Sequence, residues 1–160
     1  MAKIEDVVGR YVHVELDGID YRVYYEEAGQ GIPLVCQHTA GSDSRQWRHL
    51  LGDSDITDNF RVIAWDLPFH GKSVPPEGTN WWTEDYKLEG HWFMRFILEI
   101  CAALDAERPV FMGCSMGGQV AIDLALNHPA SFRAVVGVES GLDSGDFDPS
   151  FFNQLRQMLS

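Results

Sequence analysis

Apolar and polar residues alternate in two stretches near the N-terminus of this 160-residue chain. The stretches cover residues 11–16 and 19–26, and Asp17-Gly18 stands between them. Alternation with a period of two is typical of a strand with one buried face, and an Asp-Gly pair favours the tight turn of a hairpin. The pattern therefore predicts two antiparallel strands at the start of the domain.

Short apolar runs follow at four places further along the chain. They cover residues 33–37, 61–65, 109–112 and 134–138, with turn residues or helical patterns between them. A short, nearly continuous apolar run is typical of a strand that is buried on both faces, as in a parallel sheet. We therefore expect four such strands after the hairpin.

Segments with helical periodicity separate these runs. A short amphipathic stretch covers residues 44–51, and a longer one runs from Thr83, its predicted cap, to Leu104. A third helix is predicted over residues 116–127, because Pro129 disfavours helical backbone in the residue before it. Strands that alternate with helices predict an α/β fold: a mostly parallel sheet with an antiparallel N-terminal hairpin and helices on both faces.

Charge and cysteine content narrow the classes of partner. The formal charge of −12 is spread along the chain and disfavours binding to nucleic acid. No apolar run approaches the roughly 18 residues of a membrane span, and the N-terminus has no apolar core of a signal peptide. Cys36, Cys101 and Cys114 have no paired spacing. We therefore expect buried, reduced thiols in a cytoplasmic protein, with no disulfide and no metal site.

The clearest chemical signal is Gly113-Cys114-Ser115-Met116-Gly117, which lies between a predicted strand and a predicted helix. A G-x-S-x-G pattern in this context is typical of a nucleophile elbow, a tight turn that exposes the serine hydroxyl. Glycines at both ends leave room for the backbone to cross itself, and the first N–H groups of the helix face the reacting carbonyl. A chance glycine-rich turn is the alternative, but the strand and helix on either side favour the elbow.

Two further motifs directly follow predicted strands. Residues 36–42 read Cys-Gln-His-Thr-Ala-Gly-Ser, and residues 66–73 read Asp-Leu-Pro-Phe-His-Gly-Lys-Ser. Together with the serine motif, which follows them in the chain, they resemble the motifs of the α/β-hydrolase family. The resemblance covers nearly the whole chain. The first is similar to the His-Gly motif of that family, although Thr39 replaces its glycine. The second is similar to its D-x-x-G-x-G-x-S turn.

The resemblance implies roles for the residues of these motifs. The oxyanion hole would be formed by the N–H groups of Met116 and Ala40, with Thr39 as the alternative to Ala40. His38 and Asp66 would have structural roles in their loops, with the catalytic base as the alternative for His38 and the triad acid as the alternative for Asp66. The nucleophile Ser115 would attack an acyl, ester-like substrate or a C–C bond substrate, and no cofactor is implied.

The histidine that should activate the serine has no obvious counterpart in the chain. In this family the order is serine, acid, histidine. The only histidine after Ser115 is His128, at the far end of a predicted helix of about 12 residues, roughly 18 Å long. Glu139, directly after the last predicted strand, is a candidate for the triad acid, and a solvated carboxylate is its alternative interpretation.

We therefore expect residues 1–140 to form an α/β-hydrolase core that is truncated after its sixth strand, and residues 141–160 to begin a lid helix. The sixth strand would be an open edge, which invites pairing with a second copy or a complementing chain. Trp81, Trp82 and Trp92 could line an apolar acyl site or could belong to the core.

Two functions remain open from the sequence. One is a serine hydrolase for small acyl substrates that takes its histidine from elsewhere. The other is a non-catalytic or fragmentary homologue of the same fold, which acts as a binding or self-associating module. A histidine within hydrogen-bond reach of Ser115 would distinguish the two.

Overall fold

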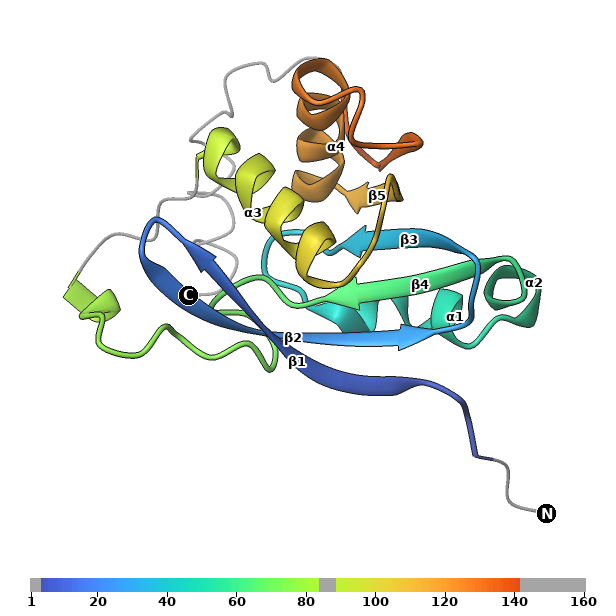
Figure 1. Cartoon of the computed structure of the whole chain (residues 1–160), viewed down its shortest axis with the longest axis horizontal. Helices are drawn as coiled ribbons and strands as arrows, with labels where there is room; N and C mark the ends of the chain where they lie inside the picture. The colour runs from blue at the N-terminus through green and yellow to red at the C-terminus, as the bar shows by residue number, and fades with distance from the viewer. Residues whose placement is uncertain (1–3, 84–88, 142–160) are drawn as a thin grey trace, which may run out of the picture.

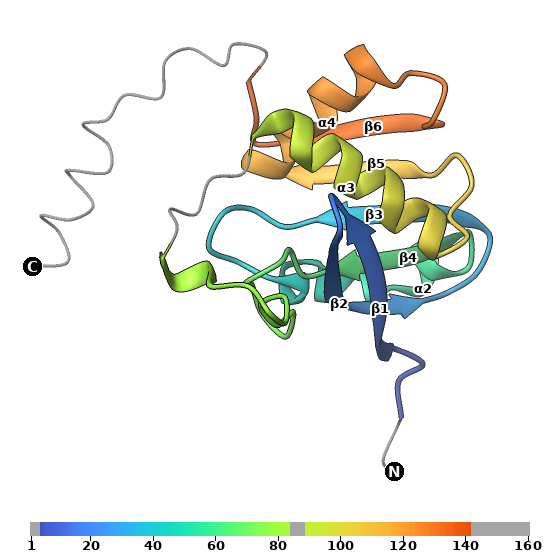
Figure 2. The same cartoon turned by 60° about the vertical axis from the view of Figure 1, so that its left-hand side comes forward.

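A six-stranded mixed sheet forms the centre of the protein, with the strand order β1-β2-β4-β3-β5-β6 (Figures 1 and 2). The computed structural model describes residues 4–83 and 89–141 of the chain. The strands are β1 (Val8–Leu16), β2 (Ile19–Ala28), β3 (Ile32–Gln37), β4 (Phe60–Trp65), β5 (Val110–Cys114) and β6 (Ala134–Val138). The helical elements are η1 (Ser44–Trp47), α1 (Arg48–Leu51), α2 (Ser54–Thr57), η2 (Trp81–Thr83), α3 (Gly90–Ala103) and α4 (Met116–Asn127). Within the described ranges, no helix has the length and apolar character needed to cross a membrane.

The hairpin forms where the sequence predicts it. Asp17 and Gly18 both have positive φ angles, 54° and 76°, as a tight hairpin turn requires. β1 pairs antiparallel with β2, and the end of β2 pairs antiparallel with β4. β4, β3, β5 and β6 are parallel to one another. The predicted mostly parallel sheet with an antiparallel hairpin is confirmed.

Helices cover both faces of this sheet, as predicted, and each face has its own core. Along β4, Ile63 and Trp65 belong to the core beneath α3 and α4, whereas Val62 and Ala64 belong to the core beneath η1 and α1. This division follows from the period of two in a strand, which sends successive side chains to opposite faces. In Figure 1, α3 and α4 lie in the upper part of the view, whereas α1 and α2 lie at the right, beside β4.

The long helix begins later than the sequence predicts. α3 starts at Gly90, after Glu89 with an extended backbone (φ −83°, ψ 151°). The hydroxyl of Thr83, the predicted cap, instead donates at 2.8 Å to the carbonyl of Asn80, the residue before η2. Because glycine is unfavourable inside a helix, a helix running through Gly90 is disfavoured, and α3 begins at that residue instead.

β6 occupies one edge of the sheet (Figure 2). It was expected to resemble the strands buried on both faces, and this is wrong: Val136 and Val138 are each 36% exposed. The physical reason is its position, because no strand of the described residues pairs with its outer side. The position of β6 at the edge of the sheet agrees with the prediction that the sixth strand is an open edge. The predicted lid helix falls mainly on residues 142–160, outside the described residues, and stays a prediction.

The three cysteines are buried and unpaired. Burial raises the pKa of the Cys36 thiol, and it raises the pKa of the Cys101 thiol to about 12. These thiols are therefore protonated at neutral pH and poorly reactive.

Candidate active site

Ser115 lies in a sharp turn between β5 and α4. Its backbone has φ 52° and ψ −109°, a region that residues other than glycine rarely adopt. Two hydrogen bonds fix the turn: Ser115 N–H donates to the Val138 carbonyl at 2.8 Å, and the Ser115 carbonyl accepts from Gln119 N–H at 2.9 Å. Ser115 is exposed at this turn. The strand–turn–helix context predicted for the motif is present.

The two glycines of the motif are required by close backbone contacts. A Cβ on Gly113 would overlap the carbonyl group of Gly117 and would lie 2.8 Å from Gly118 N. A Cβ on Gly117 would lie 2.8 Å from the Gln37 carbonyl oxygen and 3.2 Å from that of His38. The elbow is therefore packed directly against the end of β3, where the second motif of the site, residues 36–42, begins.

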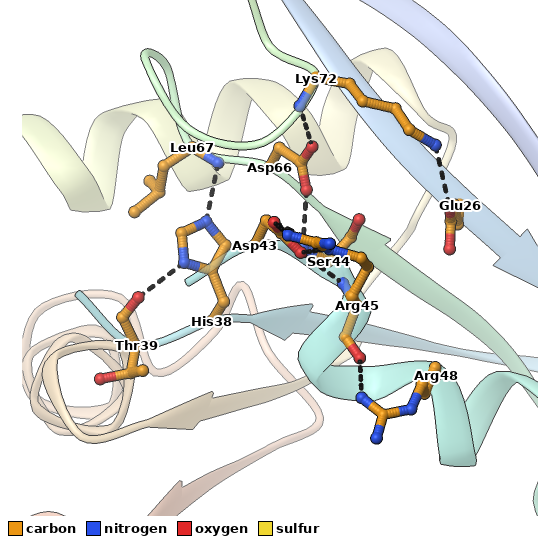
Figure 3. Close-up of polar contacts among 10 residues, drawn as sticks. All are labelled: Glu26, His38, Thr39, Asp43, Ser44, Arg45, Arg48, Asp66, Leu67 and Lys72. Carbon is orange, nitrogen blue, oxygen red and sulfur yellow. Dashed lines mark hydrogen bonds and ion pairs between the residues drawn. The ribbon is translucent and has the colours of Figure 1, made fainter. Parts of the chain in front are cut away.

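His38 holds this second motif together from a fully buried position. Its Nδ1–H donates to the Thr39 carbonyl at 2.7 Å, and its Nε2 accepts from Leu67 N–H at 3.1 Å (Figure 3). Both ring nitrogens are engaged, which requires the neutral ring with its proton on Nδ1. Burial, reinforced by the neighbouring His70, lowers the pKa of His38 below its ordinary value of 6.5. The expected structural role of His38 agrees with these contacts.

The two candidate oxyanion donors in the loop after β3, Thr39 N–H and Ala40 N–H, differ in their hydrogen-bond partners. Thr39 N–H donates to Gln46 Oε1 at 2.9 Å, so it is already occupied. Ala40 N–H has no acceptor among the described residues, and Ala40 is exposed. Thr39 has no positive φ, so threonine replaces the family's glycine without backbone strain. The geometry favours Ala40 over Thr39 as the oxyanion donor.

Asp66 ties together the loops that follow β3 and β4. Its buried carboxylate accepts from Ser44 N–H at 2.6 Å and from Lys72 N–H at 2.7 Å (Figure 3). Its carbonyl accepts from Ser73 Oγ at 2.8 Å. Lys72 Nζ lies 3.5 Å from Glu26 Oε1, which connects the same loop to β2. A carboxylate that already accepts two backbone N–H bonds organises a turn, as the sequence predicts for Asp66.

No histidine of the described residues forms a hydrogen bond with Ser115 Oγ. All six histidines of the chain lie in the described ranges. His128 is the C-terminal cap of α4, where its N–H donates to the Leu124 carbonyl, at the opposite end of the helix from Ser115. His13 lies on the hairpin beside Asp20. Within the described residues, Ser115, the predicted nucleophile, therefore has no histidine hydrogen-bonded to its hydroxyl.

Glu139 is the residue after β6, the strand that pairs with β5 and so brings its end beside the elbow. It follows Val138, whose carbonyl accepts the Ser115 N–H, and it has a positive φ of 51°. Its side chain is exposed and forms no hydrogen bond within the described residues. The backbone thus brings Glu139 close to Ser115, and its role as the triad acid stays a prediction.

The three tryptophans separate into two groups. Trp92 stacks on Phe96 at 4.6 Å between ring centroids and packs against the main core. Trp81 and Trp82 are 46% and 66% exposed in η2, where Trp81 contacts Phe69 at 5.9 Å between centroids. Core packing therefore accounts for Trp92 alone, and the other two stay candidates for an apolar acyl site.

A family model described as the alpha/beta hydrolase fold matches residues 32–160. The chain belongs to this family. The resemblance inferred from the three motifs is thereby confirmed.

Similar proteins include hydrolases and an acyltransferase. The alpha/beta hydrolase chain is 30% identical over 140 residues to a 2-hydroxy-6-oxononadienedioate/2-hydroxy-6-oxononatrienedioate hydrolase of Burkholderia vietnamiensis, covering 86% of this chain and 46% of that protein. It is 31% identical over 164 residues to the dihydrolipoyllysine-residue acetyltransferase component of the acetoin cleaving system of Cupriavidus necator, covering 97% and 40%. The chain thus spans less than half the length of these two relatives.

Among solved structures, the fold is similar to that of a membrane phospholipase A described as a bacterial virulence factor. The TM-score is 0.74 at 22% identity, and the match covers 96% of this chain and 46% of that one. Identity at this level shows the alpha/beta hydrolase fold and nothing finer.

Sequence reasoning missed one residue of the site. Gln46 lies in η1 outside the three motifs, and its contact with Thr39 spans seven positions of the chain. A glutamine in a short amphipathic stretch is an ordinary surface residue, so no local pattern marks it. Only the position of η1 against the loop after β3 reveals its role.

Proposed function

We propose that this alpha/beta hydrolase chain carries the nucleophile and the oxyanion hole of a serine hydrolase for small acyl, ester-like or C–C bond substrates. The observation that carries the proposal is the conformation of Ser115, which is exposed in a strained turn at the N-terminus of α4. Strain of this kind is stored where the surrounding structure holds a reactive group in place. The relatives named above include a C–C bond hydrolase, which supports the substrate class.

In the proposed reaction, Ser115 Oγ attacks the acyl carbon and the carbonyl oxygen becomes an oxyanion. The N–H groups of Ala40 and Met116 donate to this oxygen, and each donor is worth on the order of 10²–10³ in rate. The proton of Ser115 passes to a histidine supplied by residues outside this chain, because a serine hydroxyl is a poor nucleophile without a base. Glu139 is the proposed acid that orients that histidine.

The exposed edge at β6 is the proposed place of contact with the polypeptide that supplies the histidine. Ser115 lies at the carboxyl ends of the parallel strands, beside the end of β6, since Cys114 pairs with Val138. A second copy or a complementing chain that pairs with β6 would reach this end of the sheet. We propose no nucleic acid or membrane partner, and no cofactor.

A non-catalytic role is the second candidate, and one observation favours it. Among the described residues, no base reaches Ser115, and removal of the base costs most of the roughly 10⁶-fold contribution of a triad. The fold and the N–H groups of Ala40 and Met116 could then bind acyl compounds without turning them over.

Chemical rescue distinguishes the two candidates. The purified chain and a Ser115→Ala variant are assayed on p-nitrophenyl acetate over a series of imidazole concentrations, with imidazole standing in for the histidine. The hydrolase proposal predicts a Ser115-dependent rate that rises and saturates with imidazole above the linear background. Identical rates for both folded proteins at every concentration would leave the non-catalytic role. A Ser115-dependent rate without imidazole would mean that a base reaches Ser115 within the chain or between copies.

A further inference from the structure

A side chain outside the sequence motifs holds the loop that carries the oxyanion donor. The side chain of Gln46 accepts the Thr39 N–H through Oε1 at 2.9 Å. The backbone N–H of Gln46 donates to the Asp43 carbonyl at 3.0 Å at the start of η1. We propose that Gln46 is a positioning residue of the oxyanion hole, which leaves Ala40 N–H as the donor to substrate. This inference rests on the proposed function of Ser115.

The bond to Gln46 fixes the peptide group between His38 and Thr39. All peptide bonds of the described residues are trans, so an N–H and the carbonyl of the preceding residue point in opposite directions. With Thr39 N–H directed to Gln46, the His38 carbonyl must point away from η1. It lies beside the elbow, where a Cβ on Gly117 would come within 3.2 Å of it. Gln46 therefore sets the alignment of this loop against the nucleophile turn.

The following peptide group is fixed from its carbonyl side. The Thr39 carbonyl accepts from His38 Nδ1–H at 2.7 Å and from Ser42 N–H at 3.2 Å. By the same trans geometry, Ala40 N–H points away from both donors, and it has no acceptor among the described residues. Two neighbouring peptide groups thus have defined orientations, one occupied by Gln46 and one open.

Without Gln46, both N–H groups would lack an acceptor. Thr39 and Gln46 are half-buried, so water replaces the lost bond incompletely, and an unsatisfied N–H destabilises this arrangement of the loop. Rotation of the loop to expose Thr39 N–H would move Ala40 N–H from its place. The glutamine amide prevents this without adding a charge beside the oxygen that becomes negative.

The test compares two esters in the imidazole-supplemented assay of the full chain. p-Nitrophenyl acetate develops an oxyanion, whereas O-p-nitrophenyl thionoacetate develops charge on sulfur, which accepts hydrogen bonds poorly. The ratio of their Ser115-dependent rates therefore reports the oxyanion donors. For Gln46→Leu we expect kcat on the oxygen ester to fall about 10-fold, a part of the 10²–10³ that one donor supplies, with KM within about twofold and a similar fall in the ratio.

Hydrogen exchange of the backbone amides provides a readout independent of catalysis. Thr39 N–H should be protected in the wild-type chain and unprotected in Gln46→Leu. Gln46→Glu, which keeps an acceptor oxygen, should restore the protection, but its negative charge beside the oxyanion should keep the ratio below that of wild type. Gln30→Leu, at an exposed glutamine in the turn before β3, is the matched control and should change neither quantity.

The outcomes separate this inference from the proposed function. Loss of Thr39 protection together with a lower ratio supports the role of Gln46. A folded Gln46→Leu protein that loses the protection but keeps the wild-type ratio overturns it and leaves the hydrolase function intact. Absence of any Ser115-dependent rate in the wild-type chain overturns both.

Discussion

The elbow makes a quantitative prediction about Gly113. An alanine at this position would place its Cβ on the carbonyl group of Gly117 and 2.8 Å from Gly118 N, closer than real Cβ atoms approach. All three atoms belong to the backbone, so no side chain can rotate away, and either β5 or α4 must move. Overpacking of a core costs about 1–3 kcal/mol even where side chains can adjust. We therefore expect Gly113→Ala to lower the free energy of unfolding by at least ~4 kcal/mol, a loss that few single substitutions cause.

Gly52→Ala is the matched control for this substitution. Gly52 has a helical backbone (φ −97°, ψ −1°), and its Cβ would meet only the Arg48 carbonyl oxygen at 3.5 Å, an ordinary contact. Alanine at a compatible position stabilises a protein by about 0.4–1 kcal/mol through the unfolded chain. The two variants and the wild type are compared by urea unfolding followed by far-UV circular dichroism. A Gly113→Ala protein within about 1 kcal/mol of wild type would refute the backbone crossing described for the elbow.

Three further predictions concern the loops and the sheet edge. Because folding lowers the pKa of His38, the unfolded chain binds a proton that the folded chain excludes. The free energy of unfolding should therefore fall as the pH drops below 6.5, until the folded pKa is reached. His38→Gln should flatten this pH dependence in urea titrations, whereas His49→Gln, at an exposed residue, should not. Asp66→Asn should cost about 2–3 kcal/mol, since an amide cannot accept both N–H groups that the carboxylate accepts, whereas Asp20→Asn in the exposed pair with His13 should cost less than about 1 kcal/mol; equal losses in thermal unfolding would contradict this account. Val136→Lys should reduce any self-association through β6 in sedimentation velocity, and an unchanged distribution of associated species would place the contact elsewhere.

The sequence predicted most of the sheet because its apolar runs are short and strongly patterned. The Asp17-Gly18 turn, the strand after Arg133 and the helix from Met116 to Asn127 follow from local chemistry alone, and the structure has each of them. The start of α3 was not predicted, because the capping signal at Thr83 and the helical period around it compete with the cost of an interior glycine at position 90.

The site divides in the same way. The turn at Ser115 was predictable, since the backbone contacts that require Gly113 lie only four and five positions further along the chain. The orientation of the loop after β3 was not, because it depends on Gln46 and on Leu67, which reach the loop from other elements. The proposed preference for Ala40 over Thr39 depends on the contact of Thr39 with Gln46, which only the structure reveals.

The central claim, that the fold makes Ser115 a reactive nucleophile, is tested most directly by labelling with a fluorophosphonate. The chain is incubated with the reagent and imidazole, both folded and in urea, and the adduct is located by peptide mass spectrometry. The account predicts one adduct, on Ser115, that forms in the folded chain and is lost in urea. A folded chain that is not labelled at Ser115, or that is labelled equally well when unfolded, would contradict it.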